Sequence, residues 1–279
     1  MTEHSAPILP LGQLPRPATG ADLARRLHTA LSRYSTEELT GLDNATIAAT
    51  LDGQDIATLD IDLSGVAVDG DPKEVQDTPP KILSSAPAVV RRVTVRAHPI
   101  RIMGAAVDVR AEAEDFPIAW LEGADQSLWL DMPETAEPTQ AFVRMAVNQD
   151  ELLEVVRGHA RAAASEAGVT LARLDVTLRS SGRRSVHVRG FAKIRKGVLS
   201  ASARFRADLN LADDMMLSIS KIKLSSGNPL VAVVLLFARN HIDTSDRRID
   251  LNADMSPGLR VVDAGLETGT DLVLTARLG

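Results

Sequence analysis

The stretch that decides the fold is "VLSASARFRADLNL", residues 198–211, in which apolar and polar residues alternate from Leu199 to Leu211. The apolar set is Leu199, Ala201, Ala203, Phe205, Ala207, Leu209 and Leu211. Successive side chains of a strand point to opposite faces of a sheet, so the pattern predicts a strand with one dry and one wet face. At about 3.3 Å per residue it is roughly 40 Å long, whereas most strands have about 5 to 6 residues.

The neighbouring sequence extends this strand into a sheet. Strands are predicted at roughly 169–181, 185–195 and 215–224, and the short turns "SSGRR" and "RKG" make the sheet antiparallel. A helix is predicted ahead of it at 149–167, with Asn148 as its N-cap and Gly168 as its left-handed end. Further strands are expected around Ile249, Val261 and Leu272.

The first half of the chain also predicts a helix followed by strands in which apolar and polar residues alternate. Residues 1–18 are predicted to be a flexible tail, and a helix capped by Thr19 follows. The pair Asp52-Gly53 predicts a tight turn between two strands, and residues 69–87 are expected to be a Pro-rich loop. "VVRRVTVRAHPIRI" and "AAVDVRAEAE" alternate again. We therefore expect a tail at 1–18 and a single domain at 19–279, with its first half ending at about 133 and its second half beginning at about 141.

The run "NPLVAVVLLFA", residues 228–238, predicts a helix of about three turns, because Asn228 suits an N-cap and Pro229 suits the first helical position. It is too short for the ~20 apolar residues that a membrane span needs. Since it is apolar on every side, one sheet face cannot cover it. The predicted fold is therefore α+β, a long, strongly curved antiparallel β-sheet wrapped around apolar helices.

Composition limits the possible functions. The net charge of −6 argues against a general nucleic-acid binder. Aromatic residues make up only 3% of the chain, so its core must consist mainly of aliphatic side chains. There is no cysteine. No basic segment followed by an apolar segment opens the sequence, so we expect a cytoplasmic protein that can associate with a membrane surface.

In the order of its elements the sequence resembles the tubular lipid-binding (TULIP) superfamily, and within it the bacterial LmeA-like phospholipid-binding family. The segment from "DELLEVVRGHARAAASEAG" through the long strands to "NPLVAVVLLFA" is similar to the family's helix, meander and second helix. "TLDIDLSGVAV" through "DVRAEAE" is similar to its first half, so the resemblance covers residues 20–278. It implies a tubular apolar cavity that accepts acyl chains.

Two groups of residues are candidates for lipid contact. The predicted cavity lining is Ala201, Ala203, Phe205, Ala207, Leu209, Leu230, Val233, Val234, Leu236 and Phe237. The predicted contacts with headgroups or a membrane are Arg183, Arg184, Arg195 and Lys196. The alternatives, a packed core for the first group and an ordinary solvated surface for the second, stay open.

No pattern for catalysis, metal binding or a cofactor occurs in the sequence. The six histidines are scattered, Asp60 and Asp62 fall on the wet face of a strand, and Asp213 and Asp214 fall in a turn. We therefore expect a non-enzymatic binder or carrier of lipid, with phospholipid acyl chains as its ligand and no cofactor. A structural or adaptor domain with a packed core that binds a protein partner is the alternative, and an enzyme with an unrecognised site is the third.

Overall fold

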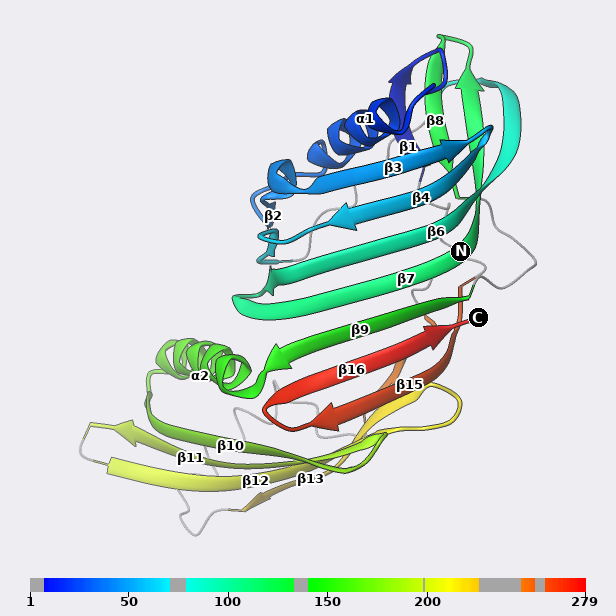
Figure 1. Cartoon of the computed structure of the whole chain (residues 1–279). Helices are drawn as coiled ribbons and strands as arrows, with labels where there is room; N and C mark the ends of the chain where they lie inside the picture. Colours follow the sequence, from blue (N-terminus) through cyan, green and yellow to red (C-terminus); the bar gives the residue numbers. More distant parts are fainter. Residues whose placement is uncertain (1–7, 71–78, 133–139, 198, 226–246, 254–258) are drawn as a thin grey trace. The chain divides into compact units, whose positions relative to one another are not determined.

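The computed structural model describes residues 8–70, 79–132, 140–197, 199–225, 247–253 and 259–279 (Figure 1). The chain divides into two compact units. The first contains residues 1–146, 254–262 and 275–279, and the second contains residues 147–253 and 263–274. The boundary falls inside a strand, at Ala146, later than the sequence predicts.

The first unit contains most of the larger sheet. Its elements are β1 (Ile8–Gln13), α1 (Gly20–Ser32), β2 (Leu39–Thr40), a 3-10 turn (Leu42–Asn44), β3 (Thr46–Asp52), β4 (Asp55–Asp62), β5 (Ala67–Val68), β6 (Ile82–Ile102), β7 (Ala105–Gly123), β8 (Ser127–Asp131) and β9 (Ala141–Asn148). The last two strands, β15 (Val261–Thr268) and β16 (Asp271–Leu278), are divided between the units.

The sheet of the first unit is built on the long antiparallel pair β6 and β7. Their pairing extends from Ile82 opposite Gly123 to Ile102 opposite Ala105. The predicted turn at Asp52-Gly53 is confirmed, since β3 and β4 form a hairpin in which Asp52 pairs with Asp55. β4 then lies parallel to β6, so this sheet is mixed rather than purely antiparallel.

Helix α1 packs on β3 and closes the core of the first unit. The predicted cap is confirmed, because the Thr19 hydroxyl accepts a hydrogen bond from the Asp22 amide. Leu23 and Leu27 are buried on its inner side. The core cluster is Leu11, Leu23, Leu27, Ile56, Leu59, Ala88, Val90, Ile118, Trp120, Leu128 and Leu130.

Two predictions for the first unit are wrong. The expected tail contains β1, which pairs with β8, and Leu11 within it is only 2% exposed. The expected loop at 69–87 ends early, because β6 begins at Ile82 and runs through Pro87. Both segments contain proline, which an edge strand tolerates since its outward amides need no partner.

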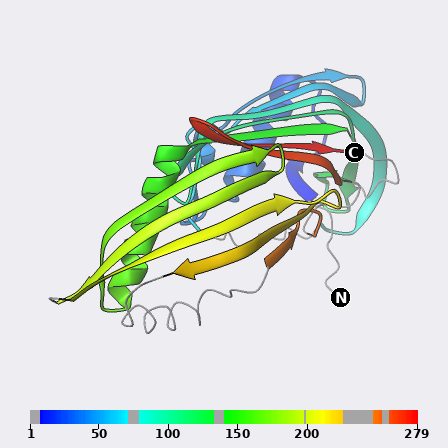
Figure 2. The same ribbon diagram turned by 90° about the horizontal axis from the view of Figure 1, so that it is seen from below.

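The second unit is a helix and a five-stranded antiparallel sheet, seen together in Figure 2. Its elements are α2 (Gln149–Glu166), β10 (Thr170–Gly182), β11 (Ser185–Lys196), β12 (Leu199–Leu211), β13 (Met216–Ser225) and β14 (Arg247–Asp250), in the strand order β10-β11-β12-β13-β14. The four long strands confirm the predicted meander to within a residue or two at each end. Asn148 caps α2 by accepting from the amides of Asp150 and Glu151.

The fold class is confirmed at the level of two described α-helices with large, mostly antiparallel sheets. Within the described strands both sheets are open, with edge strands at each end of their order. The predicted helix at 228–238 lies outside the described residues. Among the described helices, neither is long and apolar enough to cross a membrane.

Candidate functional site

The strand register of the second unit gathers apolar side chains on one side of its sheet, which we call the apolar face. Its members are Leu174, Val176, Leu178, Val188, Gly190, Ala192, Ile194, Ala201, Ala203, Phe205, Ala207, Leu209 and Ile219. Three rows cross from β10 to β12: Leu174–Ala192–Ala203, Val176–Gly190–Phe205 and Leu178–Val188–Ala207. The five predicted lining residues of β12 therefore lie together on one face.

The apolar face is only partly covered. The members named above are half-buried, whereas Val186 and Leu211, which lie on the same face near the β10–β11 turn, are buried. In the first unit, by contrast, Leu23, Ile56 and Leu128 are completely buried. The first unit thus contains a fully buried core, whereas most of the apolar face of the second unit is only partly covered.

At the middle of the apolar face an aromatic ring packs directly on a glycine. Gly190 and Phe205 are cross-strand partners, and a β-carbon placed on Gly190 would lie 1.9 Å from Cζ of Phe205. The ring therefore lies directly over the glycine backbone, where no other residue type leaves room. On one side of it Ala192 pairs with Ala203, so the next row has two of the smallest side chains.

Helix α2 packs along β10, at one edge of this sheet. The Arg157 side chain donates to the Leu174 carbonyl oxygen at 3.0 Å and pairs with Glu154 at 2.5 Å. The sequence predicts a buried stripe of Leu152, Leu153, Val156, Ala160, Ala163 and Ala164, but this prediction is wrong. Only Leu153 is buried and Val156 is 41% exposed. The helix covers the margin of the sheet and leaves much of its own apolar side unused.

The other five predicted lining residues cannot be placed on the face. Leu230, Val233, Val234, Leu236 and Phe237 lie outside the described residues.

Two of the predicted headgroup contacts are occupied within the second unit. Arg184 donates to Asp263 at 2.7 Å and to the Ala264 carbonyl oxygen at 3.1 Å, and it also pairs with Asp213. Arg183 binds the other oxygen of Asp263 at 2.8 Å. The hydrogen bond from Arg184 is the main reason why the pKa of Asp263 lies below its ordinary value. These arginines tie the β10–β11 turn to β15.

Arg195 and Lys196 are placed differently. Both are exposed at the end of β11, where Lys196 pairs with Leu199 of β12. Leu199 is itself 54% exposed. Of the four predicted headgroup contacts, these two remain available to a ligand or a surface.

A polar group that sequence reasoning missed surrounds Asp208 on the opposite face of the sheet. Its carboxylate accepts from His187 Nδ1 at 2.7 Å and pairs with Lys221 Nζ at 3.0 Å. These contacts, His187 first, lower the pKa of Asp208. The register pair His187–Asp208 could have been found from the strand alternation, but Lys221 reaches the carboxylate only because a bulge with a positive φ of 53° displaces it.

No family model, curated protein or solved structure matches this chain.

Proposed function

We propose that this protein binds the acyl chains of a lipid on the apolar face of its second unit, as a non-enzymatic binder or carrier. The observation that carries the proposal is that most of the apolar face, from Leu174 on β10 to Ile219 on β13, is only half-buried, with burial reached only at the end that contains Val186 and Leu211. The core of the first unit, in contrast, contains fully buried side chains such as Leu23 and Leu128.

Energetics favour an apolar ligand on such a face. Apolar surface left in contact with water forgoes roughly 25 cal/mol per Å² of stabilisation. An acyl chain lying along β11 and β12 would remove this apolar surface from water and so provide the missing stabilisation, without any directional contact. The small side chains of the alanines at positions 192, 201, 203 and 207 leave a smooth surface, on which a flexible acyl chain can adjust its conformation.

The chemistry of the face suits binding rather than reaction. Its members, from Leu174 to Ile219, are all aliphatic, aromatic or glycine, so they offer no nucleophile, acid or base. Exposed Arg195 and Lys196 at the end of β11 suit a phosphate headgroup, and phospholipid is therefore the class of ligand that we propose. The finer arrangement, a curved sheet wrapped around apolar helices as in tubular lipid-binding proteins, belongs to the same proposal. The apolar run from Pro229 to Ala238 supports it at the level of sequence.

The test is a pair of tryptophan variants on β12. Ala203→Trp fills space on the apolar face opposite Ala192, whereas Ser200→Trp adds the same ring to an exposed position on the other face. We expect Ala203→Trp to weaken the binding of a fluorescent fatty-acyl ligand several-fold with little change in the melting temperature, and Ser200→Trp to bind as the unmodified protein does.

Two results would count against the proposal. If Ala203 lies in a packed core, the new ring overpacks it and lowers stability by roughly 1 to 3 kcal/mol, as the adaptor alternative predicts. If both variants bind the acyl ligand equally well, the ligand does not lie on this face.

A further inference from the structure

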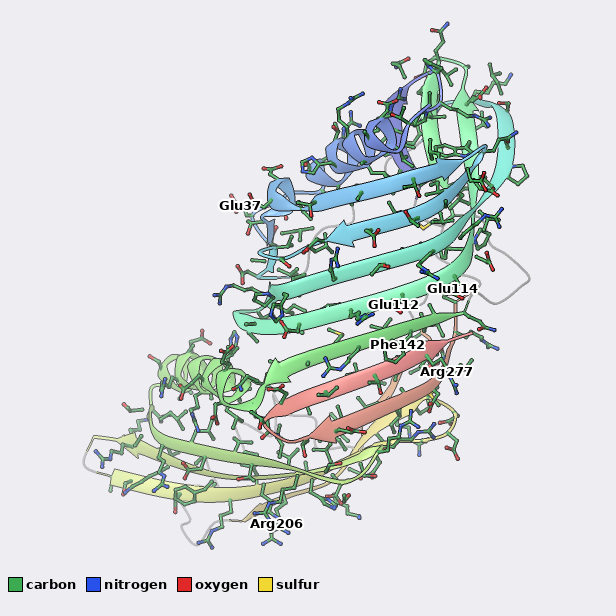
Figure 3. The ribbon with its side chains drawn as sticks, viewed as in Figure 1. Glu37, Glu112, Glu114, Phe142, Arg206 and Arg277 are labelled. Atoms are coloured by element: carbon green, nitrogen blue, oxygen red, sulfur yellow. The ribbon has the colours of Figure 1, made fainter. Side chains whose placement is uncertain are left out.

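The polar face of the second sheet carries a concentration of positive charge, of which the lipid-binding proposal uses only Arg195. Arg189 on β11 and Arg206 on β12 are direct cross-strand partners on this face. Figure 3 shows Arg206 pointing away from the sheet, on the side opposite α2. The cationic array, as we call it, consists of Arg179, Arg189, Lys193, Arg195, Arg204 and Arg206.

The charges of this array are not balanced within the part of the chain that the structure describes, where none of the six has an ion pair. Strands β10, β11 and β12 have only two carboxylates, Asp175 and Asp208. Asp175 pairs with Arg173 at 2.6 Å, and Asp208 is held by His187 and Lys221. Both acids on these strands are therefore already occupied.

Such an arrangement destabilises the isolated sheet. Like charges directly opposite each other on two strands repel, as Arg189 and Arg206 do here. The chain as a whole has a net charge of −6, so the positive charge of this face is opposite in sign to the net charge of the protein. A local positive field of this kind attracts an anionic surface and is relieved by it.

We propose that the polar face of the second sheet docks on the surface of a bilayer that contains anionic phospholipid. The cations are spread over three strands instead of converging on one point, which suits a layer of phosphates better than a single bound phosphate. Interaction with anionic lipid requires only that the charges lie within about a Debye length, ~8 Å at physiological salt, of the surface.

An aromatic side chain lies among the cations, and the overall charge of the chain favours a bilayer over a nucleic acid. Phe191 lies on the polar face opposite Arg204, and the Arg173 guanidinium is 5.8 Å from its ring centroid. A membrane interface accepts both cations and apolar side chains, and a nucleic-acid-binding protein is normally basic overall.

The test is flotation of the full chain with vesicles of phosphatidylcholine alone and with vesicles in which roughly a third of the lipid is phosphatidylglycerol. We expect binding to the anionic vesicles only, weakening as salt is raised. The double variant Arg189→Gln/Arg206→Gln should bind them about 30-fold more weakly at low salt, since each basic side chain near such a surface contributes roughly five-fold.

The matched control is Arg101→Gln/Arg161→Gln, which removes the same charge from exposed positions on β6 and α2. This variant should bind the anionic vesicles within about two-fold of the unmodified protein, because its charges lie off the array. Equal losses in both double variants, equal binding to both kinds of vesicle, or preferential binding to a single-stranded oligonucleotide over anionic vesicles would each overturn the proposal.

This inference does not depend on the ligand of the apolar face, because the array lies on the other side of the sheet. Arg189→Gln/Arg206→Gln should still bind a fluorescent fatty-acyl ligand, and Ala203→Trp should still float with anionic vesicles. Failure of docking and failure of acyl binding are therefore separate outcomes.

Discussion

The aromatic ring of Phe205 lies over the α-carbon of Gly190, its cross-strand partner between β11 and β12. A ring that packs on a residue without a side chain lies closer to the backbone of the sheet than it could on any other residue. The contact therefore keeps the centre of the apolar face close to the backbone. The neighbouring Ala192–Ala203 pair continues this low surface.

Gly190→Ala should destabilise the second unit. The added β-carbon would lie 1.9 Å from Cζ of Phe205, so the ring must move off its partner. We expect a lower melting temperature by far-ultraviolet circular dichroism, together with weaker acyl binding. The matched control is Gly158→Ala within α2, where a β-carbon meets nothing within 4 Å. That change should stabilise by roughly 0.5 to 1 kcal/mol, because alanine is the better helix former. A neutral Gly190→Ala would show that the ring is not confined.

Arg184→Ala should lower the melting temperature more than Arg183→Ala does. Both arginines bind Asp263, but the Arg184 side chain is 28% exposed and that of Arg183 is 62% exposed. Arg184 also holds Asp213 and the Ala264 carbonyl oxygen, so its loss frees more partners. Equal effects of the two changes, measured by circular dichroism, would contradict this ranking.

Stability should fall as the pH drops through the acid range. The pKa of Asp263 is lowered by the hydrogen bond from Arg184, and that of Asp208 by the hydrogen bond from His187. The folded state therefore holds these protons less tightly than the unfolded chain. Their contribution is present above the unfolded value of about 3.9 and is lost as the pH falls through the lower folded values.

Asp263→Asn isolates one part of this pH dependence. Urea unfolding at a series of pH values should give a shallower loss of stability below about pH 4 for this variant than for the unmodified protein. A steeper slope for Asp263→Asn would mean that the sign of the Asp263 contribution is wrong.

Leu23→Ala should cost the first unit about 2 to 5 kcal/mol of unfolding free energy, because it opens a cavity in a fully buried site. Leu83→Ala is the matched change at a side chain that is 66% exposed, and it should cost less than about 0.5 kcal/mol. Both tryptophans, Trp120 and Trp129, belong to the first unit, so intrinsic fluorescence follows its unfolding. Similar losses for the two variants would show that α1 does not close this core.

Local patterns predicted the elements well wherever one physical rule was enough. Alternation over residues 198–211 predicted β12, and the side chains of Thr19 and Asn148 predicted two helix starts. The hairpin turn at Asp52-Gly53 followed from the backbone freedom of glycine, whose φ there is +63°. Each of these signals lies within a few residues of its consequence.

Long-range pairing was not predictable in the same way. Nothing near β4 indicates that it lies parallel to β6, and the partner of β1 is more than a hundred residues away in β8. Pro87 argued for a loop, yet it lies where β6 extends beyond β4 and has only β7 as a partner. The candidate site was predicted in part, because alternation gives the face of Ala203 and Phe205 but not the degree to which α2 covers it.

The most direct test of acyl-lipid binding is mass spectrometry of an organic extract of the purified full chain, compared with a control protein purified in the same way. We expect acyl lipids, phospholipids among them, in clear excess over the control, and a reduced amount in the extract of Ala203→Trp. An extract indistinguishable from the control, together with no binding of a fluorescent fatty-acyl ligand, would contradict it.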